Sequence, residues 1–82
     1  MTTTIKPPTP ELVAELKKTI RKLNSKAGQM KMDLHDLAEG LPTDYETLIE
    51  ESLKTYDIYR QLDELKQQLK SWEKQLSQFD SN

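Results

Sequence analysis

The sequence predicts an all-α protein: an antiparallel helical hairpin of two long helices that dimerises into a four-helix bundle. Three observations support this prediction. The 82 residues include only 2 Gly and 4 Pro, and three of these prolines lie within the first ten residues, so the rest of the chain is almost free of helix breakers. Apolar residues recur at steps of three and four along both halves of the chain. A helix stop signal and a helix start signal lie side by side near residue 42.

Residues 1–9 are predicted to form a disordered or extended arm, because Pro7 and Pro8 disfavour helix in the residues before them. The first helix is predicted over residues 10–39. It begins at Thr9 and Pro10, because Thr is a good N-cap and Pro suits the first helical position. Its apolar seam has the period of about 3.5 residues that coiled coils show. The seam residues are Leu12, Leu16, Ile20, Leu23, Ala27, Met30, Leu34, Leu37 and Leu41.

The turn between the helices is predicted over residues 40–43. Gly40 is expected to take the left-handed conformation that ends many helices, and Pro42 blocks continuation. Thr43 and Glu46 have the spacing of a capping box, with Thr43 as the N-cap of the next helix. Two helices joined by so short a connection lie antiparallel.

The second helix is predicted over residues 44–79, followed by a frayed tail over residues 80–82. Its apolar residues form two runs that are out of phase, so we expect a local shift of the seam between them. The first run is Tyr45, Ile49, Leu53 and Tyr56. The second run is Ile58, Leu62, Leu65, Leu69, Trp72, Leu76 and Phe79. Core packing is the expected role of the aromatic residues at or near the seam, and the alternative places some tyrosines at a rim between dimers or against a client protein. These residues are Tyr45, Tyr56, Tyr59, Trp72 and Phe79.

A lone hairpin of this size leaves one side of each seam in water, so a second copy is predicted to close it. The expected interface residues are Leu16, Ile20, Leu23, Ala27, Met30, Leu34, Leu37, Leu62, Leu65, Leu69, Trp72 and Leu76. Lys17–Lys31 contains six basic residues and no acidic one, whereas Asp33–Glu51 contains seven acidic residues and no Lys or Arg. Antiparallel pairing brings these opposite charges together. The predicted assembly is a homodimer or a homotetramer.

Gly28 interrupts the first helix, where Gly costs about 1 kcal/mol relative to Ala. Folding the chain about residue 42 places Gly28 opposite roughly residues 55–59. It either makes room there for a tyrosine ring or a neighbouring helix, or it is a tolerated surface glycine. The sequence leaves both interpretations open.

Composition excludes several classes of function. The absence of cysteine excludes disulfides and cysteine-ligated zinc or iron–sulfur sites, and 2 Gly cannot build a glycine-rich phosphate loop. No apolar run approaches the roughly 18–20 residues of a membrane span, so we predict a soluble cytoplasmic protein with no membrane partner. The serines have no evident base and orienting group nearby in the sequence, and there is no second histidine. We therefore predict that the protein is not an enzyme.

His35 is the only histidine, and it shares a helix face with Glu39 while Asp36 is adjacent. One imidazole and one carboxylate supply two ligands, and a symmetric oligomer supplies twice that number. Nitrogen and oxygen ligands of this kind suit Fe(II), Ni(II) or Zn(II). The competing interpretation is a solvated helix face on which His35 pairs with Glu39. It is favoured because the spacing of only two residues is weak evidence for a metal site.

Lys17, Lys18, Arg21 and Lys22 form a candidate basic face for partner binding. Nucleic acid is disfavoured as a partner, because the basic run lacks interleaved aromatic residues and the net charge is -2. A solvated face that complements the acidic end of a second copy is the favoured interpretation, with RNA binding as the alternative.

The stretch LNSKAGQMKMDLHDLAEGLPTDYE, Leu23 to Glu46, resembles a small family found with nitrogen-fixation genes and described as Rop-like for its helical hairpin. The resemblance covers about residues 11–78, and the MDLHDLAEGLP block is its most specific part. It implies an all-helical hairpin, a homo-oligomer and a setting in nitrogen-fixing bacteria, and some members are labelled metalloproteins. We therefore expect a non-enzymatic accessory or interaction protein, with a nitrogen-fixation protein as partner. Metal binding and RNA binding are the alternatives.

Overall fold

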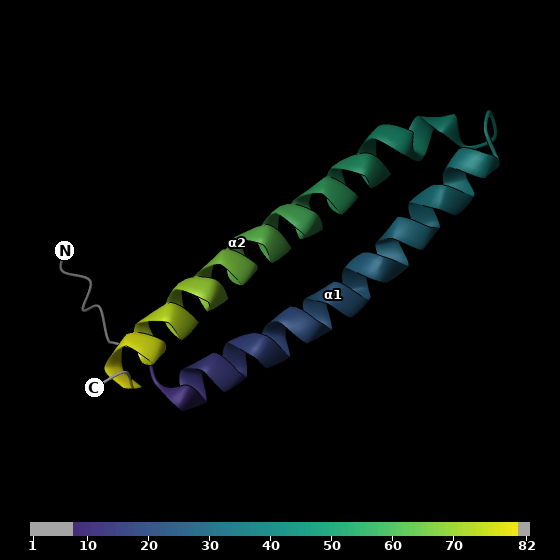
Figure 1. Cartoon of the computed structure of the whole chain (residues 1–82). Helices are drawn as coiled ribbons and strands as arrows, with labels where there is room; N and C mark the ends of the chain where they lie inside the picture. Colours follow the sequence, from purple (N-terminus) through teal and green to yellow (C-terminus); the bar gives the residue numbers. More distant parts are fainter. Residues whose placement is uncertain (1–7, 81–82) are drawn as a thin grey trace, which may run out of the picture.

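The computed structural model describes residues 8–80, which form a helical hairpin (Figure 1). Helix α1 spans Pro10–Glu39, a 3₁₀ turn η1 spans Tyr45–Thr47, and helix α2 spans Leu48–Asp80. The helices run antiparallel, with their connection at one end of the molecule (Figure 1). No strand occurs within residues 8–80. The predicted all-α fold of two helices is confirmed.

Helix α1 begins with the N-cap that its sequence contains. The Leu12 N–H donates a hydrogen bond of 3.1 Å to the Thr9 hydroxyl oxygen, and the Val13 N–H donates one of 3.0 Å to the Thr9 carbonyl. Pro10 occupies the first helical position, where its missing N–H leaves nothing unpaired. A cap of this kind typically contributes about 1 kcal/mol.

The turn differs from the sequence prediction at Gly40. This residue is right-handed, with φ -83° and ψ -4°, so the expected left-handed cap is wrong. Its N–H donates to the carbonyls of Asp36 and Leu37 at 3.1 and 3.2 Å, which continues the helical winding into the turn. The left-handed residue is Asp44, with φ 58°. Asp tolerates this conformation better than most residues, and the reversal of the chain therefore takes place four residues later.

The predicted capping box is also wrong. The Thr43 N–H donates to the Gly40 carbonyl at 3.0 Å, which places Thr43 inside the turn. Asp44 is the residue that precedes the helical segment, and its side chain makes no capping hydrogen bond. Instead the Thr47 hydroxyl donates to the Asp44 carbonyl at 2.9 Å. The second helical segment thus opens as η1 and becomes an α-helix at Leu48.

The core lies where α1 meets the middle of α2. Ala27, Ile58 and Leu62 are 0%, 5% and 2% exposed and pack together. The partly buried Ile20, Leu23 and Met30 surround them. Ala27, and not Gly28, therefore faces α2, and a Cβ on Gly28 would meet nothing within 4 Å. Within residues 8–80, Gly28 makes room for neither a tyrosine ring nor the other helix.

The first apolar run of the second helical segment faces away from the core. Tyr45, Ile49, Leu53 and Tyr56 are 64%, 75%, 62% and 66% exposed, so this run lies outside the core of the hairpin. Tyr45, Tyr56 and the 41% exposed Tyr59 therefore do not pack in that core as predicted. We call the four residues of this run the outer stripe.

The helical period explains this orientation. The inner face of α2 contains Ile58, Leu62 and Leu65. Each of these residues lies nine positions after a residue of the stripe, which are Ile49, Leu53 and Tyr56 in the same order. Nine residues are about two and a half helical turns, so the two sets lie on opposite sides. Because α2 is continuous over 33 residues, it keeps one phase, and the expected local shift of the seam does not occur.

We predict that Leu62→Ala lowers the free energy of unfolding by about 2–4 kcal/mol, because it removes a large side chain from the best-buried contact between the helices. Met32→Ala is the matched control: Met32 is 56% exposed, so its change should stay within about 0.5 kcal/mol. Urea unfolding followed by circular dichroism, at one fixed protein concentration, measures both. Equal losses in the two variants would contradict the placement of the core.

Candidate functional site

The inward seam is largely half-buried in the single hairpin. Of the residues expected at an oligomer interface, Leu16, Ala27 and Leu62 are already buried within the chain. The others are half-buried: Ile20, Leu23, Met30, Leu34, Leu37, Leu65, Leu69, Trp72 and Leu76. No large side chain in the described part of the chain is less than 2% exposed. The hairpin therefore presents an apolar seam that a further layer of helices would bury.

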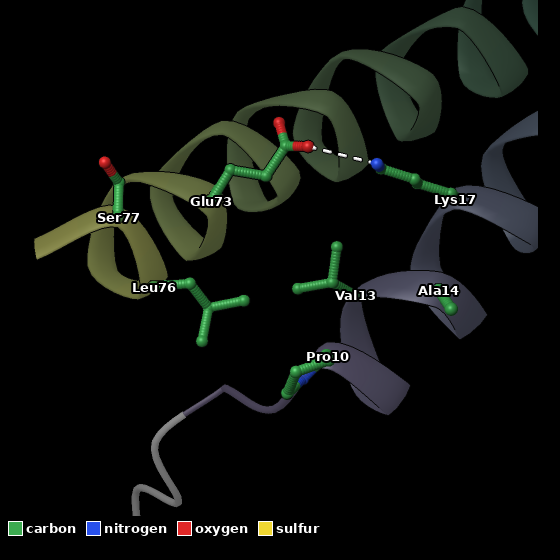
Figure 2. Close-up of a pocket in the computed structure, with 7 residues that line it drawn as sticks. All are labelled: Pro10, Val13, Ala14, Lys17, Glu73, Leu76 and Ser77. Carbon is green, nitrogen blue, oxygen red and sulfur yellow. Dashed lines mark ion pairs between the residues drawn. The ribbon is translucent and has the colours of Figure 1, made fainter. Parts of the chain in front are cut away.

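At the open end of the hairpin, a solvent-open groove separates the first turns of α1 from the last turns of α2 (Figure 2). Val13 and Leu76 face each other across it, and Lys17 and Glu73 form its rim. The Lys17 ammonium lies 3.3 Å from a Glu73 carboxylate oxygen, and both side chains are about half exposed. An exposed ion pair of this kind contributes about 0–1 kcal/mol. The groove offers apolar contact and one neutralised charge pair.

His35 lies on the exposed side of α1, near the turn. Its Nε2 lies 3.3 Å from a Glu39 carboxylate oxygen, and its Nδ1 lies 3.8 Å from one of Asp36. The structure thus brings together the three residues that the sequence singled out as metal ligands. Within residues 8–80, however, no group of three or more His, Asp or Glu side chains is arranged to hold a metal ion. Within the described chain, these three side chains therefore do not form a metal site by themselves.

The candidate basic face is exposed, but one of its members is engaged within the hairpin. Lys17 points toward Glu73 across the open end (Figure 2). Lys18, Arg21 and Lys22 are exposed, and none of them makes an ion pair within residues 8–80. The face that remains for a partner is therefore smaller than the sequence predicted.

Charged side chains on the first half of α2 form ion pairs with one another, a feature that the sequence analysis did not predict. Arg60 donates hydrogen bonds of 2.8 Å to Asp57 and Glu64. The hydrogen bond from Arg60 lowers the pKa of Asp57, and the same bond raises the pKa of Arg60. The spacings of three and four residues were the signal that could have revealed these pairs.

Lys54 is engaged in the same way. Its ammonium lies 3.3 Å from Glu50 and 3.7 Å from Glu51, and the hydrogen bond with Glu50 raises the pKa of Lys54. The two cations next to the outer stripe, Lys54 and Arg60, are thus paired within α2. The acidic residues outnumber them, so this part of the surface is negatively charged.

The profile of the Rop-like family matches residues 11–74 of the sequence. The chain belongs to the Rop-like family. The resemblance inferred from the Leu23–Glu46 stretch is thereby confirmed. A solved structure shows the same fold: the crystal structure of a DUF683-family protein from the cyanobacterium Cyanothece 51142 has a TM-score of 0.79 and 74% sequence identity. The similarity covers 80% of this chain and 93% of that one.

Relatives of this Rop-like chain occur in several bacteria. A UPF0437 protein of Nostoc sp. is 67% identical over 61 residues, which are 74% of this chain and 86% of the relative. A UPF0437 protein of Frankia alni is 47% identical over 49 residues, 60% of each chain, and its name places it in the nifX-nifW intergenic region. One member of the family is therefore encoded among nitrogen-fixation genes. Within residues 8–80, neither helix contains a stretch long and apolar enough to cross a membrane.

Proposed function

We propose that this chain is a non-enzymatic accessory protein of nitrogen fixation, which assembles into a homo-oligomeric helical bundle and binds another protein of that system. The half-buried seam is the observation that carries this proposal, because nine of the twelve expected interface residues retain exposed apolar surface in the single hairpin. The gene position of the Frankia alni relative supports the setting. Self-association is known in the Rop-like family.

Two hairpins complete a four-helix bundle when their seams face each other. Each square ångström of apolar surface removed from water stabilises the bundle by about 25 cal/mol. The antiparallel arrangement is favoured, because it sets the acidic turn end of one copy beside the open end of the other, where the basic stretch Lys17–Lys31 begins. A parallel arrangement would place the two acidic ends together. Salt screens the attraction between such exposed charges, so the antiparallel contact is weaker at high ionic strength.

Binding of a divalent transition metal is the second candidate function, and it would use His35 and Glu39, which form an exposed pair on one face of α1. The imidazole and carboxylate already lie 3.3 Å apart on one exposed turn, so little reorganisation is needed to bring both to one ion. Two copies whose turn ends meet would supply four nitrogen and oxygen ligands, a set that suits Fe(II), Ni(II) or Zn(II). In an antiparallel dimer the turn ends lie apart, so this site would require contact between two dimers, as in a homotetramer. Asp36, the further candidate, lies beside the other ring nitrogen, Nδ1, so in this rotamer it does not face the same ion as Glu39.

The assembly is tested by native mass spectrometry and sedimentation equilibrium of the untagged protein. We expect an even-numbered oligomer for the wild type. Leu69→Gln should shift the mass toward the single chain, because it places an amide in the half-buried seam. Gln68→Ala, on the exposed neighbouring residue, is the matched control and should keep the wild-type mass. A monomeric wild type, or a Leu69→Gln protein of unchanged mass, would contradict the role of the seam.

The setting is tested by deleting the gene in a nitrogen-fixing host and measuring acetylene reduction. We expect a loss of nitrogenase activity and unchanged growth on ammonium. The wild-type gene and the Gln68→Ala variant should restore activity, whereas Leu69→Gln should not. Restoration by His35→Ala would assign the role to protein binding, and its failure would assign it to metal binding. Full nitrogenase activity in the deletion strain would count against the proposed setting.

The metal site is tested by isothermal titration calorimetry with Ni(II), Zn(II) and, without oxygen, Fe(II). We expect one ion per two chains, because one chain supplies too few ligands, and we expect His35→Ala to abolish binding. Asp33→Ala is the control, since Asp33 is an exposed carboxylate on the same helix whose partner is Gln29. Equal heats for all three proteins would rule out a site at His35.

A further inference from the structure

The outer stripe gathers apolar surface on one short segment. Among residues 8–80, eight large hydrophobic side chains are exposed, and four of them are the residues of this stripe. Ile49, Leu53 and Tyr56 have the spacing i, i+4, i+7, which aligns them on one face of α2 over about two turns. Tyr45 adds one further side chain at the start of the segment. An exposed apolar patch with charged residues beside it is typical of a protein-binding site.

Assembly through the seam does not cover the outer stripe. Each stripe residue of α2 lies about two and a half turns from the inner-face residue nine positions later, so the stripe points away from α1. In a four-helix bundle the seam faces of all helices converge on the common core. The outer stripe therefore remains on the outside of the bundle, available to another molecule.

The charges beside the stripe are predominantly negative. Glu50 and Asp57 each follow a stripe residue directly, and their spacing of seven residues places them on the same side of α2. The neighbouring cations, Lys54 and Arg60, pair with carboxylates of α2 itself. No Lys or Arg occurs between Asp33 and Glu51. Glu50 and Asp57 are themselves partners of these cations, but residues 45–60 contain four carboxylates (Glu46, Glu50, Glu51 and Asp57) and two cations, so the surface beside the stripe keeps a net negative charge. This surplus favours a partner that is basic as well as apolar.

A second copy of this chain does not offer apolar side chains and positive charge on the same surface. Two outer stripes packed on each other would bring the acidic rows of both copies together. The basic stretch Lys17–Lys31 supplies complementary charge, but it lacks apolar cover. The large exposed hydrophobic residues of α1 are Leu12 and Met32, which lie just outside the two ends of that stretch. A different protein is therefore the better occupant.

We propose that the outer stripe is a docking site for a basic amphipathic helix of a partner protein. The helix would place apolar side chains at i, i+3, i+4 and i+7 on Ile49, Leu53 and Tyr56, and Lys or Arg beside Glu50 and Asp57. This inference rests on the proposed function, in which the chain binds another protein, and it gives the binding site and the chemistry of that partner. The charges give the contact its orientation and make its association rate dependent on salt.

A synthetic peptide tests this site. The probe is a fluorescein-labelled amphipathic helix of about five turns, with leucine on one face and lysine on the flanks. We expect it to bind the full-length protein in a fluorescence anisotropy titration, more weakly at high salt. A peptide of the same design with glutamate in place of lysine should not bind.

Substitutions in the stripe locate the contact. Ile49→Ser with Leu53→Ser should weaken peptide binding by about tenfold or more, since buried apolar anchors dominate such interfaces. Met32→Ser is the matched control, because it removes an exposed apolar side chain from α1 and should leave affinity unchanged. Glu50→Gln with Asp57→Asn should weaken binding and flatten its salt dependence. Circular dichroism verifies that each protein remains helical. In NMR spectra of the ¹⁵N-labelled protein, we expect peptide binding to shift the amide resonances around Tyr45–Tyr56.

Three results would overturn the docking site: equal affinity in the stripe and control variants, equal binding of the lysine and glutamate peptides, or a lower oligomer mass in the stripe variant. The last result would assign the stripe to a second copy of the chain. Failure of this site is distinguishable from failure of the proposed function. If deletion of the gene lowers nitrogenase activity but the stripe variant restores it, only the docking site is wrong. If the stripe binds the peptide but the deletion has no effect, only the setting is wrong.

Discussion

The contact of Ala27 with Ile58 and Leu62 fixes how the two helices face each other. Ala27 is fully buried, so the α1 backbone approaches α2 closely at this point, and the rotation of α2 about its own axis is determined there. Because α2 is one continuous helix from Leu48 to Asp80, that rotation also fixes the direction in which the rest of the helix faces. The inward seam and the outward direction of the outer stripe are thus two consequences of the same contact.

The stability of the single hairpin is limited by the small amount of apolar surface that it buries. Five hydrophobic residues are buried within the described part of the chain, and no polar or charged side chain is buried with them. The ion pairs lie on the surface, where each contributes about 0–1 kcal/mol, so they add little to stability. A structure of this kind gains stability mainly from further burial of its seam, and for this reason folding and assembly are expected to be coupled.

The sequence predicted those features that depend on local spacing. The two helices follow from the apolar period and the scarcity of breakers, and the contact between His35 and Glu39 follows from a spacing of four residues. The cap of α1 was predictable because Thr9 and Pro10 have no competitor nearby. The turn was less predictable, because Gly40 and Asp44 can both adopt the left-handed conformation and the structure uses Asp44.

The orientation of the outer stripe could not be obtained from spacing alone. The two apolar runs of α2 were visibly out of phase, and either of them could have faced α1. Packing against Ala27 selects Ile58 and Leu62, and this choice depends on residues that lie about thirty positions apart in the sequence. The proposed metal site poses a related difficulty, because one chain does not hold a complete ligand set and no local pattern encodes where a second copy would lie.

The two apolar surfaces of the chain suit two different partners because they differ in charge as well as in direction. The seam is flanked along the hairpin by a basic stretch and an acidic stretch, so a second copy in the antiparallel orientation satisfies both. The outer stripe has only the acidic surroundings of the turn end. In an antiparallel bundle the turn ends of the two copies point in opposite directions, so the stripes are separated by a distance comparable with the length of α1, about 45 Å. One short helix cannot reach both stripes, so the proposed dimer would present two independent sites, which would either bind two partner molecules or hold one elongated partner at two points.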